Sequence, residues 1–303
     1  MSSDHRRGIS WALASAIGSA GFVIPWKLAS TYGPATTSTL ILLVSAAVFT
    51  SILTAYQQRS LPTFNGFDFR VALGLAICTL IGNLASAHAI EALSPALLTV
   101  LQRSEVIIVA LLAWPILGER IDRRFWIGSA IALGGLYLIQ DPIAGDDARA
   151  DGMVWAGLSV FCFGSMSVIT RRVIHRIDAV SVNALRLWVS VGLWFIWNGF
   201  PAELHEISRG QLGFAALAAF FGPFMARLCL MASARYIEAR LTTLATLAAP
   251  PLTLALSYVL LADLPGVRAM QGGLIMLIGI SIPILGLARG PKTSDKAEYT
   301  PAD

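Results

Sequence analysis

The chain has 303 residues, of which 56% are hydrophobic and 13% are charged, and its formal net charge is +4. A soluble domain carries about 25% charged residues, so this chain lacks the polar side chains needed to cover a water-soluble globule, and it is too apolar to be disordered. The small positive charge does not indicate a nucleic-acid partner, and we expect none. What remains is a protein that crosses a lipid bilayer many times.

Ten apolar segments follow one another along the chain, joined by short connections. Each approaches or exceeds the length of about 20 apolar residues that a membrane-spanning helix needs. They cover residues 8–29, 35–56, 69–91, 94–117, 124–140, 152–171, 179–199, 210–232, 237–262 and 268–288. All three cysteines lie inside these segments, which favours packing over disulfides. We therefore predict an all-α integral membrane protein with ten transmembrane helices.

The second half of the sequence repeats the first. The pattern Gly-x-x-Trp-Ala-x-x-Ser occurs at 8–15 and again at 152–159, an offset of 144, and residues 85–92 resemble 232–239 at an offset of 147. Further pairs at the offset of 144 are Gly128 with Gly272, Gly135 with Gly279, Glu119 with Asp263 and Lys27 with Arg171. Each half holds five segments, so the second half must enter the membrane upside down. Inverted repeats of this kind are typical of secondary transporters.

The repeat divides the chain into domains. We predict a first five-helix repeat over residues 1–145 and a second over 146–290. Residues 291–303 are mostly polar, and we expect them to form a disordered cytoplasmic tail.

Basic residues in the connections predict the orientation, because cytoplasmic loops carry an excess of Lys and Arg. With a cytoplasmic N-terminus, that side collects 15 basic residues and the other side only 4. The 15 are Arg6, Arg7, Arg59, Arg70, Arg120, Arg123, Arg124, Arg171, Arg172, Arg176, Arg235, Arg240, Arg289, Lys292 and Lys296, and the 4 are Lys27, Arg149, Arg209 and Arg268. We therefore expect both termini to be cytoplasmic.

Short motifs at corresponding places add to the repeat. The fourth segment ends in Leu-Gly-Glu-Arg at 117–120, and the third ends in Ile-Glu-Ala at 90–92, copied at 237–239. With these motifs and its duplicated five-helix unit, the chain resembles the drug/metabolite transporters, specifically the EamA-type ten-helix exporters, over residues 8–288. It departs from them in the fourth segment, where Gln-Arg-Ser-Glu at 102–105 stands in place of a proline often found there.

The resemblance implies a function and a location. It implies a multi-pass protein of the cell inner (plasma) membrane that exports small metabolites, above all amino acids, including aromatic or other hydrophobic ones. Transport would proceed by alternating access, through a cavity walled by the first, third, fourth, sixth, eighth and ninth helices. The expected partners are a small-molecule substrate and the lipid bilayer, with no cofactor and no metal. The oligomeric state stays open.

Ionisable groups at bilayer depth are expensive, so each is a candidate for function. The fourth segment holds Gln102, Arg103 and Glu105. Gln102 and Glu105 share a helix face, whereas Arg103 and Glu105 point about 200° apart. Each therefore needs a partner on another helix, a substrate or water. They form either a polar cavity wall or an interhelical ion pair.

Two polar residues of the third segment and several flanking residues complete the predicted site. Asn83 either contacts the substrate or forms a hydrogen bond between helices. His88 is either a proton acceptor or a solvated residue near the helix end. The predicted substrate contacts are Trp26, Lys27, Asn83, Gln102, Arg103, Glu105 and Phe163, and the predicted proton-coupling groups are Glu105 and His88.

Other basic residues of the segments have a plainer interpretation. Lys27 either snorkels to the outer surface or lines the outer mouth, and for Arg227 we expect snorkelling towards the cytoplasmic face. Lys27, Arg103, Arg186 and Arg227 together oppose a single carboxylate, Glu105. A net basic interior favours a substrate with an anionic group.

Three alternatives differ in class. One is multidrug efflux or another small-solute facilitator of the same superfamily. Another is a membrane enzyme acting on lipid phosphates. This class is disfavoured because the only Asp cluster of the sequence lies in an outer loop and because the sequence contains no phosphate-loop or zinc-protease motif. The third is a channel or a scaffold.

Overall fold

A computed structural model gives the fold of the chain and describes residues 3–58, 64–92, 101–119, 121–139, 150–199, 207–261 and 266–288. These residues form helices and no strand. The helices are α1 (Ser3–Thr31), α2 (Ala35–Gln58), α3 (Gly66–Ala92), α5 (Glu105–Leu117), α6 (Arg123–Ile139), α7 (Ala150–Val173), α8 (Ala179–Asn198), α9 (Arg209–Ala219), the π-helix η2 (Phe220–Ala226), α10 (Arg227–Ser233), α11 (Ala239–Thr246), α12 (Ala249–Leu261) and α13 (Val267–Ala288). The predicted tail lies outside the described residues.

Six stretches of the described chain are helices long and apolar enough to cross a membrane, judged by length and composition. They are Ser3–Trp26, Thr36–Gln57, Gly66–Ser86, Asp151–Val173, Ala179–Asn198 and Arg209–Ser233. These are the first, second, third, sixth, seventh and eighth predicted segments. The fifth and tenth correspond to α6 and α13.

The fourth and ninth helices are discontinuous, and they break at matching points. The fourth departs from α-helical geometry at Ser104, whose N–H donates to the Leu101 carbonyl only three residues back. In the ninth, a turn at residues 247–248 separates α11 from α12. Ser104 and Ala248 are 144 residues apart, which is the repeat offset. Broken helices at corresponding points of two repeats are typical of transporter binding sites.

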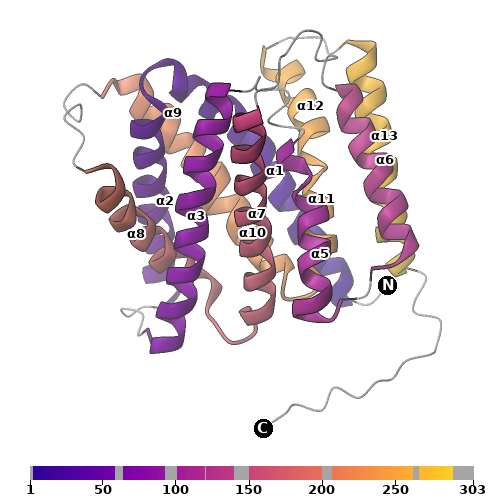
Figure 1. Cartoon of the computed structure of the whole chain (residues 1–303), viewed down its shortest axis with the longest axis horizontal. Helices are drawn as coiled ribbons and strands as arrows, with labels where there is room; N and C mark the ends of the chain where they lie inside the picture. The colour runs from indigo at the N-terminus through magenta and orange to yellow at the C-terminus, as the bar shows by residue number, and fades with distance from the viewer. Residues whose placement is uncertain are drawn as a thin grey trace.

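The contacts between helices follow the same repeat (Figure 1). The first transmembrane helix, α1, packs along the eighth, α9 to α10, just as the sixth, α7, packs along the third, α3. Likewise α1 contacts α11 and α12, as α7 contacts α5. Three further contacts, α2 with α8, α5 with α11 and α6 with α13, join equivalent helices of the two halves. The protein is thus an all-α membrane protein whose ten transmembrane helices form two inverted five-helix repeats.

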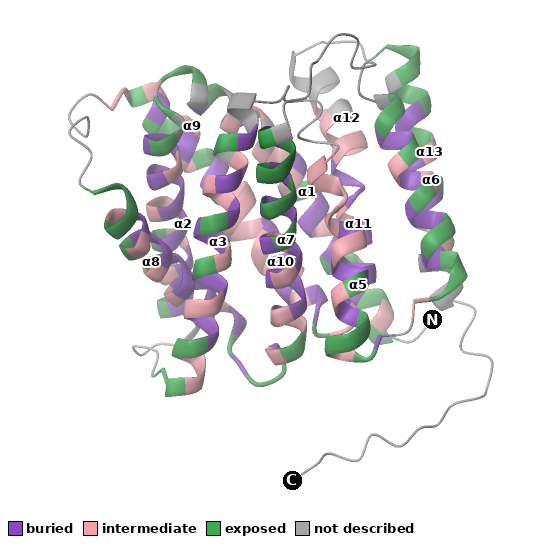
Figure 2. Cartoon of the chain, viewed as in Figure 1, coloured by how far each residue is buried: buried purple, intermediate pink, exposed green. Residues whose placement is uncertain are grey.

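Many large apolar residues of the described chain are exposed, and Figure 2 shows exposed residues along the helices of the bundle. Ile196 and Trp197 on α8 are 82% and 74% exposed, and Leu274 on α13 is 62% exposed. In water such patches would drive aggregation. In a bilayer they face lipid, which is the environment that the composition predicts.

The pair α6 and α13 stands at one edge of the bundle and is joined by glycine (Figure 1). A Cβ atom on Gly135 would lie 2.5 Å from the backbone nitrogen of Met276, and one on Gly279 would lie 2.5 Å from that of Ala132. Only glycine permits so close an approach of the two backbones. The glycines matched between the repeats therefore form the contact that joins the fifth and tenth helices.

Candidate functional site

Two oppositely charged side chains at membrane depth converge on helix α7. The Ser167 hydroxyl donates to Oε1 of Glu105 at 3.1 Å, and Nη2 of Arg227 donates to Oγ1 of Thr170 at 3.2 Å. Ser167 and Thr170 lie three residues apart, on one face of α7. Glu105 and Arg227 form no ion pair within 4.0 Å, and Arg227 is an electrostatic partner of the Glu105 carboxylate. They form a separated pair of opposite charges at the junction of α5, α7 and α10.

A small cavity lies beside this pair, between α7, α10 and α11. Its polar lining consists of the Arg227 guanidinium and the residues Ser167, Thr170, Thr242 and Thr243. The remaining lining residues are Leu230, Met231, Ala234 and Ala239. The cavity has room for about one water molecule. A metabolite can therefore enter it only if the surrounding helices move.

A second buried arginine has a different environment. Arg186 on α8 is 3% exposed and donates through Nε and Nη2 to Oδ1 of Asn183, at 3.2 and 2.9 Å. Its Nη1 donates to Oγ1 of Thr79 on α3 at 2.7 Å and contacts the Met166 sulfur on α7. These partners from three helices hold the guanidinium in place, so Arg186 braces the bundle.

The structure places the polar residues of the fourth segment as follows. Gln102 donates through Nε2 to the Ser86 hydroxyl on α3 at 2.7 Å, and Glu105 accepts from Ser167 on α7. The expectation that each needs a partner from elsewhere than its own helix is confirmed for these two. Nε of Arg103 is buried without a hydrogen-bond partner among the described residues, and Glu105 is its electrostatic partner.

The other predicted site residues are not all gathered at this place. Asn83 donates through Nδ2 to the Thr79 carbonyl within α3, and Phe163 packs against the apolar cluster of α3, α7 and α8. Trp26 stacks on Phe22, with ring centroids 5.7 Å apart. His88 is exposed, with its ring 5.1 Å from that of Trp155. The side chain of Lys27 lies outside the described part of the chain.

The prediction that Arg227 snorkels was wrong, and the local helix geometry explains why. The helix forms π turns over η2, immediately before Arg227, and Pro223 inside η2 lacks the N–H of a regular turn. A π turn holds an extra residue, so the following side chains lie on a different face from the one that regular periodicity predicts. Arg227 is consequently directed at Thr170 on α7. Gly222-Pro223 was the available signal in the sequence.

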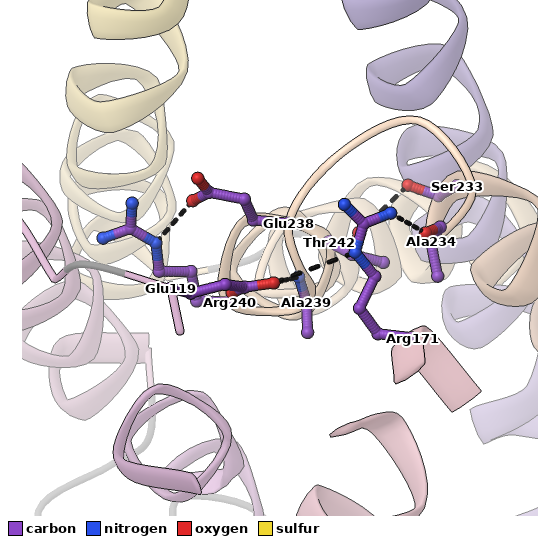
Figure 3. Close-up of polar contacts among 8 residues, drawn as sticks. All are labelled: Glu119, Arg171, Ser233, Ala234, Glu238, Ala239, Arg240 and Thr242. Atoms are coloured by element: carbon purple, nitrogen blue, oxygen red, sulfur yellow. Dashed lines mark hydrogen bonds and ion pairs between the residues drawn. The ribbon is translucent and has the colours of Figure 1, made fainter. Parts of the chain in front are cut away.

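A polar network joins the two repeats at the ends of α5, α7 and α10 and the start of α11 (Figure 3). Glu119 is buried and lies just after α5. Its Oε1 accepts a hydrogen bond from the Ala239 N–H at 3.0 Å. The same oxygen lies 3.8 Å from Nε of Arg171 at the end of α7. Arg171 also donates through Nη1 to the Ala234 carbonyl. Glu119 therefore caps the N-terminus of α11, where a carboxylate is favoured by the helix dipole. Burial, with a smaller contribution from Glu238, raises the pKa of Glu119, against the opposing effects of the Ala239 N–H and Arg171.

Neighbouring contacts extend this network. Nε of Arg240 lies 2.6 Å from Oε2 of Glu238, and its Nη1 lies 3.7 Å from Oδ1 of Asp122. The Ser233 hydroxyl donates to the Gly8 carbonyl at 2.8 Å and lies 3.2 Å from that of Thr242. The start of α1, the ends of α5, α7 and α10 and the start of α11 are thus held together, and Ala234, Ala239 and Thr242 of this network also line the cavity. Nothing in the described chain resembles a metal site, since no three His, Cys, Asp or Glu residues cluster there.

Two broken helices, a charged pair at membrane depth and two inverted five-helix halves define the class, a multi-pass membrane transporter for small solutes. The chain belongs to the EamA-like transporter family, whose sequence model matches residues 6–140 and again residues 150–285. A solved structure described as "Crystal structure of protein" is similar in fold, with a TM-score of 0.71 and 16% identity, over 94% of this chain and 96% of the other. No protein of curated function matches the chain.

Proposed function

We propose that the protein exports amino acids from the cell across the inner membrane, by alternating access between its two repeats. The observation that carries this proposal is the separated pair of Glu105 and Arg227, each bonded to a hydroxyl of α7 beside the small cavity. A zwitterionic amino acid offers an ammonium group to the carboxylate and a carboxylate to the guanidinium. In the absence of the substrate, the two charges partly offset each other across the gap.

Alternating access requires that the contacts on one side break while those on the other side form. In this proposal the network around Glu119 and Arg171 closes the inner side in the present conformation. Its opening would separate the end of α5 from the start of α11 and expose the cavity to the cytoplasm. The glycine contact between α6 and α13 would stay packed as the halves move.

The test is counterflow in proteoliposomes that are preloaded with unlabelled solutes from a panel of amino acids, nucleosides and organic acids. We expect amino acids on the inside to accelerate uptake of a labelled amino acid. A folded, correctly inserted protein that exchanges none of them would contradict the amino-acid proposal, and exchange of lipophilic drugs would then favour multidrug efflux. A steady ohmic current would indicate a channel.

Proton coupling is assigned in this proposal to Glu105, with His88 as the second predicted group. We expect Glu105→Gln to abolish uptake driven by a pH gradient, because the amide cannot take up and release the coupled proton. His88→Gln is the matched comparison, since His88 lies against Trp155 and is exposed. Unchanged pH dependence in Glu105→Gln would exclude the carboxylate as the coupling group.

A further inference from the structure

The intramembrane charges of the described chain are unequal in number. Three arginines, Arg103, Arg186 and Arg227, stand against the single carboxylate Glu105. Arg186 is held by Asn183 and Thr79, so its donors are occupied by the protein. Arg103 does not line the cavity, although its Nε is also buried without a hydrogen-bond partner among the described residues. The excess positive charge that faces the cavity is that of Arg227.

Arg227 is incompletely satisfied by the protein. A guanidinium has five N–H donors, and the described contact of this one is the single bond from Nη2 to Thr170. Among the described residues, its Nε is buried without a hydrogen-bond partner and no carboxylate lies within 4.0 Å of it. A buried cation left in this state costs stability unless something else completes it. The cavity is where that missing partner would lie.

The rest of the cavity supplies what an anion needs. The residues Ser167, Thr170, Thr242 and Thr243 line the cavity from two helices. The hydroxyls of Ser167 and Thr170 donate to Glu105 and to the Met166 carbonyl. The Thr243 hydroxyl can donate to a carboxylate oxygen in the cavity. An arginine also binds a carboxylate through two parallel N–H bonds, which fixes the orientation of the ligand. The other lining residues are apolar, which strengthens such bonds by excluding water.

The first repeat does not carry this arrangement. Its residues at the positions equivalent to Arg227, Ser167 and Thr170 are Leu80, Val23 and Trp26, at offsets of 147, 144 and 144. A polar cluster needed only to hold each five-helix half together would be expected in both halves. Thr243 is matched by Thr99 at the offset of 144, whereas Arg227, Ser167 and Thr170 have no charged or hydroxyl counterpart in the first repeat, which is the pattern of a site added to a symmetric scaffold.

We propose that Arg227 is a specificity-determining residue that binds the carboxylate of the transported solute, positioned by the π turns of η2 and assisted by Thr243 of α11. The site therefore selects carboxylate-bearing solutes and rejects their amides and the corresponding amines. The inference rests on the proposed transport function and restricts the transported solutes to those that carry a carboxylate. Glu105, on the other side of Ser167, is placed for the ammonium group of an amino acid.

The test compares four probes that differ only in their charged groups: phenylalanine, phenylalaninamide, phenethylamine and 3-phenylpropionate. Binding to the purified full-length protein is measured as the shift of its melting temperature with ligand concentration. We expect the two carboxylates to stabilise the wild type and the other two to have little effect. Arg227→Gln should weaken carboxylate binding at least tenfold and leave the response to the amide unchanged. Arg172→Gln, an exposed arginine at the end of α7, is the matched control.

Stability without ligand separates a binding role from a structural one. Because Arg227 is a buried and incompletely paired cation, Arg227→Gln should melt no lower than the wild type when ligand is absent. Should that variant fail to fold, Thr243→Val removes a hydroxyl of the same cavity and should weaken carboxylate binding while sparing the amide response. Equal discrimination between phenylalanine and its amide in wild type and variant would overturn the inference.

Counterflow with the same probes separates this inference from the proposed function. Amino-acid exchange that is unaffected by Arg227→Gln would overturn the role of Arg227 and leave amino-acid export standing. Exchange of phenethylamine without exchange of either carboxylate would overturn both. Loss of carboxylate exchange in Arg227→Gln, with Arg172→Gln like the wild type, is the result we expect.

Discussion

The arginines of the bundle have different surroundings, and this gives opposite expectations for their removal. Arg186 makes charge-assisted hydrogen bonds to Asn183 and Thr79 that tie α8 to α3. We expect Arg186→Gln to lower the free energy of unfolding by about 2 kcal/mol or more, since Asn183 would lose its buried partner. Arg186→Lys should not restore it, because an ammonium cannot copy the guanidinium fork.

Thermal melting in detergent measures this difference. The same curves recorded for Arg227→Gln provide the internal comparison, because that arginine donates one described bond and should be dispensable for folding. Arg172→Gln, at an exposed position, should not change the curve. An Arg186→Gln protein as stable as the wild type would show that the bonds to Asn183 and Thr79 contribute little.

At the scale of elements, the cap that Glu119 places on α11 predicts a dependence on pH. The pKa of Glu119 in the folded chain lies above its ordinary value of 4.5, mainly through burial. The folded state then binds a proton more tightly than the unfolded state does. The contribution of Glu119 to the free energy of unfolding is therefore fully present below pH 4.5 and is lost as the pH rises from there through the raised pKa.

Glu119→Gln removes this titration and should flatten that part of the melting profile. Asp122→Asn is the matched control, because Asp122 pairs with Arg240 in the same network and is more than half exposed. We expect its profile to keep the slope of the wild type. A Glu119→Gln profile with an unchanged slope would show that another group titrates there.

The contact between α6 and α13 gives a sharper comparison, since two adjacent glycines have opposite surroundings. A Cβ on Gly135 would meet backbone atoms of Met276 at 2.5 Å, whereas one on Gly134 would meet nothing within 4 Å. We expect Gly135→Leu to force the helices apart and to lower the melting temperature strongly. Gly134→Leu should be tolerated, because its side chain would point away from α13. Equal losses would show that leucine disturbs α6 itself.

At the scale of the whole molecule, the sequence predicts the architecture well and the site only in part. Periodic glycines, the 144-residue offset and ten apolar segments lead directly to the two inverted repeats, because these features depend on chain composition and length. Glu105 was predicted as a polar wall residue, and its partner Ser167 lies on another helix. Arg227 was counted in the basic interior, but its contact with Thr170 was not predicted, because its direction depends on π turns that regular helical periodicity does not show.

Glu119 illustrates a second limit. Its motif was recognised as a family feature, but its contacts with Ala239 and Arg171 lie 120 and 52 residues away in the chain and in the other repeat. Spacing within a segment cannot show such partners. The repeat predicts which helices are equivalent, whereas their packing determines which side chains meet.

The inverted symmetry of the two halves leaves open which side of the membrane the termini of the bundle face. Exchanging the two halves turns the structure over, so the fold alone does not choose a side, and the asymmetry of Lys and Arg must do so. With the cysteines at 78, 162 and 229 replaced, we expect Tyr32→Cys to react with an impermeant maleimide from outside intact cells. His175→Cys, in the exposed turn after α7, should react only after permeabilisation. The reverse pattern would invert the assignment, and labelling of both from outside would mean that the chain inserts in two orientations.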